Sequence, residues 1–484
     1  MKLFGVLIEK PNVRTLRIVL LEPVILFYMM GIWMQFSLFQ PLLFEKICSR
    51  TLGSDDNSCQ NSTRLNATTR KGIQEETSRL LFWSNLCLTI PSICLAPFLG
   101  YWGDTFGRKF PVLLPSLGAL LSAINYAVCA AIPGTPAELL LLSNLFQGLT
   151  GGFTGVILAV SSWAATLTSI RIRTSRLGLI EFANLFGTAI APAVGGAVAK
   201  QWGSPYAFGV AGLLTVLQIA YVMFFLRVEK PHPGSSHSSG YSGASTLIPL
   251  RELFGFIRTK WTDLNARFMI SMAALCLTVT WLVSTGTTEI RYLFVESLNL
   301  NWDILEYNLF AAEDAGIRGL TLVTILPFLK HYWHMKDFPI MLCAFSSKIV
   351  MFALWAASKT SALIFIAPVT GFLAAAVSAC GRSAASKFVQ KTDQGKLFSL
   401  LAILENLSSL IGSLVFQNVY VATRVWFSGF PFVLADIFLL VPVAFLLLYM
   451  PILRSTEASN TVDRQQLLDE AVLDTDSARD IPKR

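Results

Sequence analysis

Several ionisable residues stand within long apolar runs of this 484-residue sequence, where an ionised side chain is costly. The main candidates for chemistry are Glu181, Glu289, Arg382 and Glu405, and Asn184 follows Glu181 on the same face of a helix. An ionised group inside a bilayer costs roughly 2.5–3.5 kcal/mol on insertion scales, so it usually lines a cavity or faces a partner. These residues are therefore candidates for binding a proton or a polar solute.

Glu181 is expected to bind a proton reversibly, with Glu289 or Glu405 as a second carrier, because a buried carboxyl group is stable in its neutral form. A structural salt bridge is the alternative for Glu181. The planar guanidinium of Arg382 suits a carboxylate, sulfate or phosphate on a solute. The alternative for Arg382 is a cation at a helix end. All four histidines lie in polar connections, which leaves proton binding within the apolar runs to carboxylates.

Other charges in the runs are expected to have structural roles. Asp314 and Arg318 stand four residues apart on one helix, a spacing that favours an ion pair. Lys348 is a candidate to neutralise one of the nearby carboxylates, Glu289 or Glu405.

Composition indicates that helices crossing a membrane must position these residues. The chain is 54% hydrophobic and only 14% charged, whereas a soluble chain has about a quarter charged residues. Runs of roughly 20 apolar residues can cross a bilayer as helices, and the two-residue alternation of a β-barrel is absent. The runs lie at 18–42, 80–103, 110–131, 138–164, 176–199, 205–227, 266–290, 304–329, 338–357, 361–381, 397–420 and 429–450. The prediction is an all-α membrane protein with twelve transmembrane helices.

The runs divide into two six-helix halves, a layout that large transporters share, with the solute site between the halves. The first half is 1–228 and contains a polar loop at 43–79. A linker at 229–264 is rich in Pro, Gly, Ser and His at its start, and the second half is 265–454. The polar tail at 455–484 is expected to be disordered.

The charge distribution predicts the orientation of the chain. The net charge of +8 could suggest nucleic acid, but the basic residues fall in short connections between runs, so no nucleic-acid partner is expected. This bias places both termini in the cytosol, and no cleavable signal peptide is evident. The loop at 43–79 then faces away from the cytosol, where Asn61 and Asn66 are glycosylation acceptors.

One connection carries a motif. The stretch from Gly100 to Lys109, GYWGDTFGRK, resembles the GxxxDxxGRK signature of the major facilitator superfamily. Gly107 permits a tight turn, and Asp104 can accept hydrogen bonds from a helix N-terminus or an arginine. Arg108 and Lys109 stay at the cytosolic face, where such a cluster would hold the two halves together. An ordinary charged loop that only sets topology is the alternative.

A closer resemblance runs from the first helix to the twelfth, to solute carrier family 46, the proton-coupled folate transporter family. The segments that carry it are Glu22-Pro23, RTSRLGLIE ending at Glu181, GRSAASK from Gly381, TDQGKLFS from Thr392, GFPF from Gly429 and Trp302-Asp303.

The resemblance implies roles for particular residues. Glu181 matches the family's helix-5 acid, which couples proton and substrate, and Arg382 matches its helix-10 arginine, which handles protons and anionic substrate. The chain departs from the family at Asn301, where the family has a cysteine, so Cys48 and Cys59 in one loop are the remaining disulfide candidate. Gly-Gly-Phe stands at 151–153 in place of an acidic residue, which argues against folate as the substrate.

The tail carries an acidic dileucine pattern, Asp463 with Leu467 and Leu468, typical of signals read by sorting adaptors. The alternative to a sorting signal is an exposed amphipathic segment. Since one member of the resembled family is lysosomal, an endolysosomal membrane is favoured over the plasma membrane.

Together these features predict a secondary active transporter that moves a small organic, anionic solute with protons by alternating access. It needs the lipid bilayer and no cofactor besides the coupling proton. A facilitative uniporter without proton coupling and a non-transporting receptor or scaffold are the alternatives. No nucleophile–base set or metal-ligand spacing is present, so an enzyme is not expected.

Overall fold

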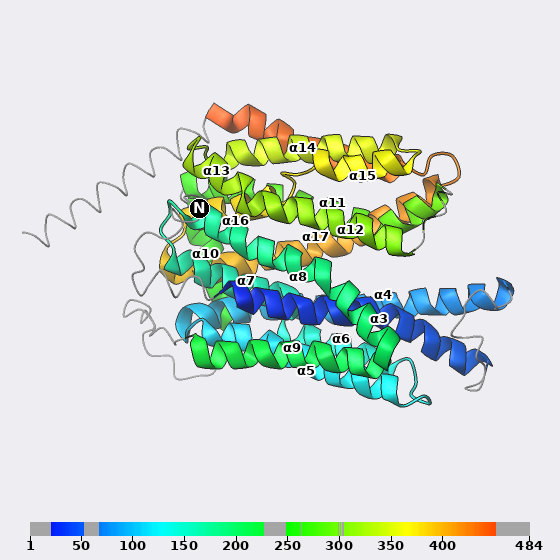
Figure 1. Ribbon diagram of the computed structural model, residues 1–484. Coiled ribbons are helices and arrows are strands. Elements are labelled where there is room, and N and C mark those ends of the chain that lie inside the picture. Colours follow the sequence, from blue (N-terminus) through cyan, green and yellow to red (C-terminus); the bar gives the residue numbers. More distant parts are fainter. Residues whose placement is uncertain are drawn as a thin grey trace, which may run out of the picture.

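The computed structural model describes residues 21–52, 67–226, 248–262, 264–298, 300, 302 and 304–451, and these form a bundle of long helices without strands (Figure 1). The helices before the linker are α3 (Glu22–Leu52), α4 (Ala67–Thr105), α5 (Lys109–Ala131), α6 (Leu139–Thr150), α7 (Gly152–Leu167), α8 (Arg173–Trp202) and α9 (Ser204–Phe225). The later elements are α10 (Ile248–Thr262), α11 (Leu264–Ser297), α12 (Ile304–Val323), α13 (Ile325–His331), α14 (Asp337–Ala357), α15 (Ser361–Thr370), α16 (Ala376–Lys387), η4 (Lys391–Asp393), α17 (Gln394–Thr423) and a last helix, Phe430–Pro451.

The helices of the described residues form twelve membrane crossings. Ten segments of the described chain are long and apolar enough to span a membrane, and α6 with α7 together form one of them. The pairs α12 with α13 and α15 with α16 make two further crossings, each interrupted within the bundle. The predicted twelve-helix membrane fold is confirmed.

Interruptions within crossings were not expected, and glycine explains the clearest one. The predicted run at 138–164 breaks at Gly151, whose φ is +101°, and Gly152 follows at +56°. A Cβ at Gly151 would stand 2.6 Å from Leu99 Cδ1. Both the left-handed backbone and the close packing therefore require glycine.

The predicted loop at 43–79 was wrong at both ends. In the structure α3 continues to Leu52 and α4 begins at Ala67, so the connection is much shorter. Polar sequence indicated exposure to water, but a helix satisfies its own backbone groups and continues beyond the apolar span. Exposure and loop structure are separate properties, and the sequence pattern indicated only the first.

Several predictions fall on residues that the structure does not describe. Cys48 is disulfide-bonded, but its predicted partner Cys59 is outside the described residues, so this pairing stays a prediction. Other predicted features also lie outside the described residues, and the predictions made for them stay predictions. They are the residues Asn61, Asn66, Asn301, Asp303, Asp463, Leu467 and Leu468, the linker stretch 229–245 and the tail 455–484.

The predicted linker contains a helix. α10 packs against α4, α11 and α17, with Leu253 and Phe256 buried against the bundle. The sequence pattern does not predict it, because it is short and amphipathic and lacks the long apolar run of a membrane-crossing helix. In Figure 1 α10, α13 and the start of α3 lie at one end of the bundle, which we call the α10 end.

Several pairs of helices join the chain before the linker to the chain after it. α4 and α7 pack along α17, and α8 packs along α12. At the first contact Gly100 meets the backbone of Gly395, so the two helices approach closely where neither residue has a side chain. α8 also packs against α16, and α16 against α17. This packing brings the candidate residues of three helices to one place.

Candidate functional site

Glu181 of α8, Arg382 of α16 and Glu405 of α17 meet in the interior of the bundle. Arg382 NH1 donates to Glu181 Oε2 at 2.9 Å, and Arg382 NH2 donates to Glu405 Oε2 at 3.0 Å. The three side chains are 5–8% exposed. We call this group the central triad; it joins residues that are 201 and 23 positions apart in sequence.

Neighbouring side chains hold the triad in place. The guanidinium of Arg382 lies over the Trp281 ring of α11, 5.5 Å from its centroid, an attractive arrangement for a cation. Beside Glu405, Asn406 Nδ2 donates to Thr154 Oγ1 of α7 at 3.0 Å and ties α17 to α7. The charged groups are thus positioned by helices on both sides of the linker.

The central triad carries more negative than positive charge when all three groups are ionised. Arg382 balances one carboxylate, so the other remains uncompensated in a medium where charge is poorly solvated. Glu405 Oε1 is buried and has no hydrogen-bond partner among the described residues. Binding of one proton to either carboxylate would bring the triad to neutrality.

The contacts of Glu181 and Arg382 bear on the alternative roles predicted for them. Glu181 forms a salt bridge, as its alternative role predicts. Its partner Arg382 also pairs with a second acid, Glu405. Arg382 is not a helix-end surface cation, since it is buried within α16. Both of its terminal nitrogens hold carboxylates in this conformation, so its predicted contact with an anionic solute stays a prediction.

Two predicted site residues lie apart from the triad. Glu289 of α11 accepts hydrogen bonds from Ser413 Oγ and Gln417 Nε2 of α17, each at 2.6 Å. The half-buried Asn184 side chain makes no hydrogen bond with the described residues around it. Neither residue forms a hydrogen bond or an ion pair with Arg382, so Glu405, and not Glu289, is the second acid at the site.

A second buried charged group surrounds Asp314. The predicted pair with Arg318 is confirmed, at 2.6 Å between NH2 and Oδ2. Arg291 NH1 of α11 approaches the same oxygen at 2.7 Å, a contact that sequence spacing could not indicate. Lys348 of α14 does not pair with a carboxylate as expected; its Nζ donates to Ser284 Oγ at 2.7 Å. We call Arg291, Asp314, Arg318 and Lys348 the α12 cluster.

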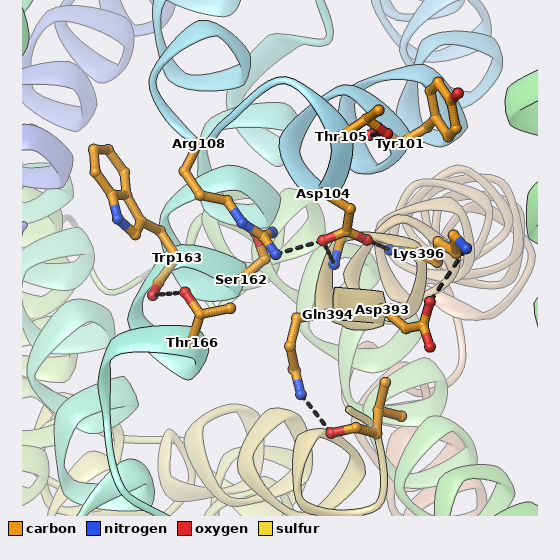
Figure 2. A network of polar contacts seen from close by, with 12 residues as sticks. Tyr101, Asp104, Thr105, Arg108, Ser162, Trp163, Thr166, Asp393, Gln394 and Lys396 are labelled. Atoms are coloured by element: carbon orange, nitrogen blue, oxygen red, sulfur yellow. Dashed lines mark hydrogen bonds and ion pairs between the residues drawn. The ribbon is translucent and has the colours of Figure 1, made fainter. Parts of the chain in front are cut away.

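The signature motif forms a contact between the two parts of the chain (Figure 2). Asp104 pairs with Arg108 and accepts the backbone N–H groups of Gly395 at 2.9 Å and Lys396 at 3.1 Å. Both partner types expected of Asp104, an arginine and a helix N-terminus, are therefore present. Arg108 NH1 also donates to Ser162 Oγ of α7 at 2.7 Å.

Glycine and lysine complete the motif. Gly107 has a φ of +109°, a left-handed conformation that favours glycine and turns the chain into α5. Lys109 Nζ donates to the carbonyl of Met223 at the end of α9, at 2.9 Å.

Further contacts at the α10 end were missed by sequence reasoning. Asp337, fully buried at the start of α14, pairs with Lys330 and Lys387 and accepts a hydrogen bond from Thr174 Oγ1 of α8 at 2.8 Å. An acid placed directly at the start of an apolar run was the available signal. Hydrogen bonds to the Asp104 and Asp337 carboxylates thus join the two parts of the chain at the α10 end.

Known proteins resemble this architecture. The profile of the Major Facilitator Superfamily matches residues 23–317. The human organic anion transporter MFSD10 (TETRAN) has the same fold, with a TM-score of 0.67 at 17% identity over 90% of this chain and 100% of that chain.

Relatives of similar length resemble the sequence. The chicken lysosomal proton-coupled steroid conjugate and bile acid symporter SLC46A3 is 27% identical over 89% of this chain and 93% of its own length. The bovine proton-coupled folate transporter is 25% identical over 76% of this chain and 78% of its own length. The chain belongs to the major facilitator superfamily and, within it, to solute carrier family 46.

Proposed function

We propose that this multi-pass membrane protein is a secondary active transporter that moves a small organic anion together with protons. The observation that carries the proposal is the central triad, in which two buried carboxylates share one guanidinium. A group that gains or loses one proton changes between neutral and charged. That change alters its fit to a buried site and can be linked to the movement of a solute.

In this scheme Glu405 and Glu181 share Arg382 as their counter-ion. The proton binds at Glu405, whose Oε1 is the buried oxygen without a partner among the described residues. Protonation weakens the hold of Glu405 on Arg382, and deprotonation restores it. Because the triad joins α8 to α16 and α17, its protonation changes the attraction between the two parts of the chain.

Alternating access is supported by the contacts at the α10 end. The Asp104 contact with α17 and the Asp337 contact with Thr174 both join helices on opposite sides of the linker. They would have to break for that end to open. The conformation described here corresponds to the state that is closed at the α10 end.

The relatives support the choice of solute and coupling ion. The chicken relative is a proton-coupled symporter of steroid conjugates and bile acids by name, and the bovine relative is a proton-coupled folate transporter by name. Amphipathic organic anions of this kind are the substrates we propose. We further propose cytosolic termini, an endolysosomal location set by adaptors at the tail, glycosylation at Asn61 and Asn66, and no cofactor.

The test is solute uptake into proteoliposomes that contain purified protein, with and without an imposed pH gradient. A steroid sulfate and a bile acid serve as solutes. Acid on the side from which the solute enters should increase the initial rate several-fold. The variants Glu405→Gln and Glu181→Gln cannot bind the proton at that position, so their rates should no longer respond to the gradient. Glu45→Gln, at an exposed acid of α3, is the matched control.

The alternatives give different results in the same experiment. A facilitative uniporter would transport the solutes at rates that ignore the gradient in the unaltered protein. A receptor or scaffold would transport neither solute under any gradient. Either outcome would refute proton-coupled transport, and a gradient response that persists in both glutamine variants would refute the role of the central triad.

A further inference from the structure

The α12 cluster is a charged group that the central triad does not explain. Two cations, Arg291 and Arg318, pair with one carboxylate, Asp314, and a third, Lys348, lies within electrostatic range of Arg318 and Asp314. When all four groups are ionised, Asp314 balances one positive charge, which leaves an excess of two. Lys348 and Asp314 are almost fully buried, and Arg291 is only 12% exposed. Excess positive charge within a membrane protein is unfavourable unless an anion balances it.

Other acids nearby do not balance the cluster. Glu313 lies about 100° around α12 from Asp314, on the side opposite to Arg318, and forms no ion pair with the described residues. Glu289 is held by Ser413 and Gln417 of α17. Neither acid forms an ion pair with a cation of the cluster, so Asp314 is its only directly paired carboxylate among the described residues.

The cations also have hydrogen-bond donors to spare. Arg291 Nε is buried and has no partner among the described residues. The ammonium group of Lys348 has three donors, and within the described chain it makes one hydrogen bond, to Ser284 Oγ. Arg291 and Lys348 thus keep donors free in the cluster, where the second oxygen of Asp314, Oδ1, also has no hydrogen-bond partner among the described residues. Free donors on two cations can bind an anionic group.

An aromatic wall adjoins the cations. The Arg291 guanidinium lies 5.5 Å from the centroid of the Trp355 ring and 5.8 Å from that of Phe310. Lys348 Nζ lies 5.7 Å from the Phe352 ring centroid. Rings that pack against the cations fix their positions and exclude water, so an anion bound there would meet donors that are already oriented.

Arg318 is the member of the cluster on α12 that lies nearer to the side of this helix that meets α8. Arg318 falls between Asp314 and Gly319 around the helix, and a Cβ at Gly319 would stand 3.3 Å from Phe182 of α8. Arg318 is also the most exposed member, at 23%. On α11, Ser284 follows Trp281, the partner of Arg382, by one turn. One contact of the α12 cluster, Ser284, thus lies one helical turn along α11 from a contact of the central triad, Trp281.

We propose that the α12 cluster binds the sulfate or carboxylate group of the transported solute, with Arg318, Arg291 and Lys348 as the donors. The inference rests on the proposed transport function and adds the place where the anionic group binds. It also gives the anion a receptor other than Arg382, whose terminal nitrogens are occupied by carboxylates.

The test is equilibrium binding to the full-length protein in nanodiscs of phosphatidylcholine, at one pH and without a gradient. The probes are dehydroepiandrosterone sulfate and dehydroepiandrosterone, which share the steroid and differ in charge. The unaltered protein should bind the sulfate at least tenfold more tightly. Arg318→Gln and Lys348→Met should each remove at least tenfold of the sulfate affinity and leave the affinity for the neutral steroid unchanged. Arg318→Lys should retain most of the sulfate affinity.

The controls separate charge recognition from folding and from lipid. Arg424→Gln removes an exposed cation after α17 and should change neither affinity. If Arg318→Gln does not fold, the sulfate affinity of Lys348→Met tests the proposal in its place. Nanodiscs with phosphatidylserine show whether a lipid headgroup takes the site. Displacement of the sulfate by this lipid would overturn the proposal.

Two further outcomes would overturn it. One is equal affinity of the unaltered protein for the two probes, and the other is an equal loss of both affinities in the variants. Because no transport is measured, the result is independent of the flux test. Charge-selective binding without flux would refute only the transporter, and proton-coupled flux with no effect of Arg318→Gln on binding would refute only the anion receptor.

Discussion

Replacement of Asp104 by asparagine tests whether the motif keeps the α10 end closed. The Asp104 carboxylate accepts two backbone N–H groups from the start of α17, those of Gly395 and Lys396, and pairs with Arg108. An asparagine of the same shape has one acceptor oxygen and no charge. It can keep one of the two N–H bonds at reduced strength, and it leaves Arg108 without its anion.

The size of the effect follows from these contacts. A hydrogen bond to a charged group contributes about 1.5–3 kcal/mol, against about 0.5–1.5 kcal/mol for a neutral one. Loss of one N–H bond and weakening of the other should therefore cost about 2–4 kcal/mol in the closed state only. Since about 1.4 kcal/mol is a factor of ten, the closed state should lose at least roughly 30-fold in population relative to the open state.

A matched control exists at a second contact of Lys396. Glu252 of α10 pairs with Lys396 at 3.0 Å, but its side chain is 48% exposed, whereas that of Asp104 is 5% exposed. An exposed ion pair contributes about 0–1 kcal/mol. Glu252→Gln should therefore shift the same equilibrium by no more than about fivefold.

The assay is a distance measurement by double electron–electron resonance across the α10 end. Spin labels at Ile172, before α8, and at Tyr332, after α13, occupy exposed positions on the two parts of the chain. A background without the other reactive cysteines is needed. Asp104→Asn should populate a longer distance that is minor in the unaltered protein. An unchanged distance distribution, or an equal shift in Glu252→Gln, would refute the reasoning.

Two further predictions concern stability, measured as the unfolding temperature in detergent. Gly151→Ala should lower the unfolding temperature, because a left-handed alanine costs roughly 1–2 kcal/mol and its Cβ would overlap Leu99. The control is Gly196→Ala, at a position with open space and an ordinary φ. Equal effects of the two substitutions would contradict the argument. Asp337→Asn should lower the unfolding temperature more, because removing one member of a buried ionic group costs about 3–5 kcal/mol; an unchanged temperature would show that the contacts with Lys387 and Thr174 contribute little.

The sequence by itself determined the number and order of the crossings, because the length of an apolar run is a property of consecutive residues. It also located the motif turn, where Gly107 adopts the left-handed conformation that the pattern required. The ion pair of Asp314 with Arg318 could also be predicted from the sequence, since the two residues stand one helical turn apart. Each of these features depends on residues that are close in sequence.

Only the tertiary structure decided which charged side chains meet. Glu181, Arg382 and Glu405 come from three helices, and nothing in their spacing chose Glu405 over Glu289 as the second acid. In a membrane both the lipid-facing and the protein-facing sides of a helix are apolar, so sequence gives little indication of which side faces inward. The rotation and packing of the helices set the partners of each buried charge, and these depend on contacts between residues far apart in the chain.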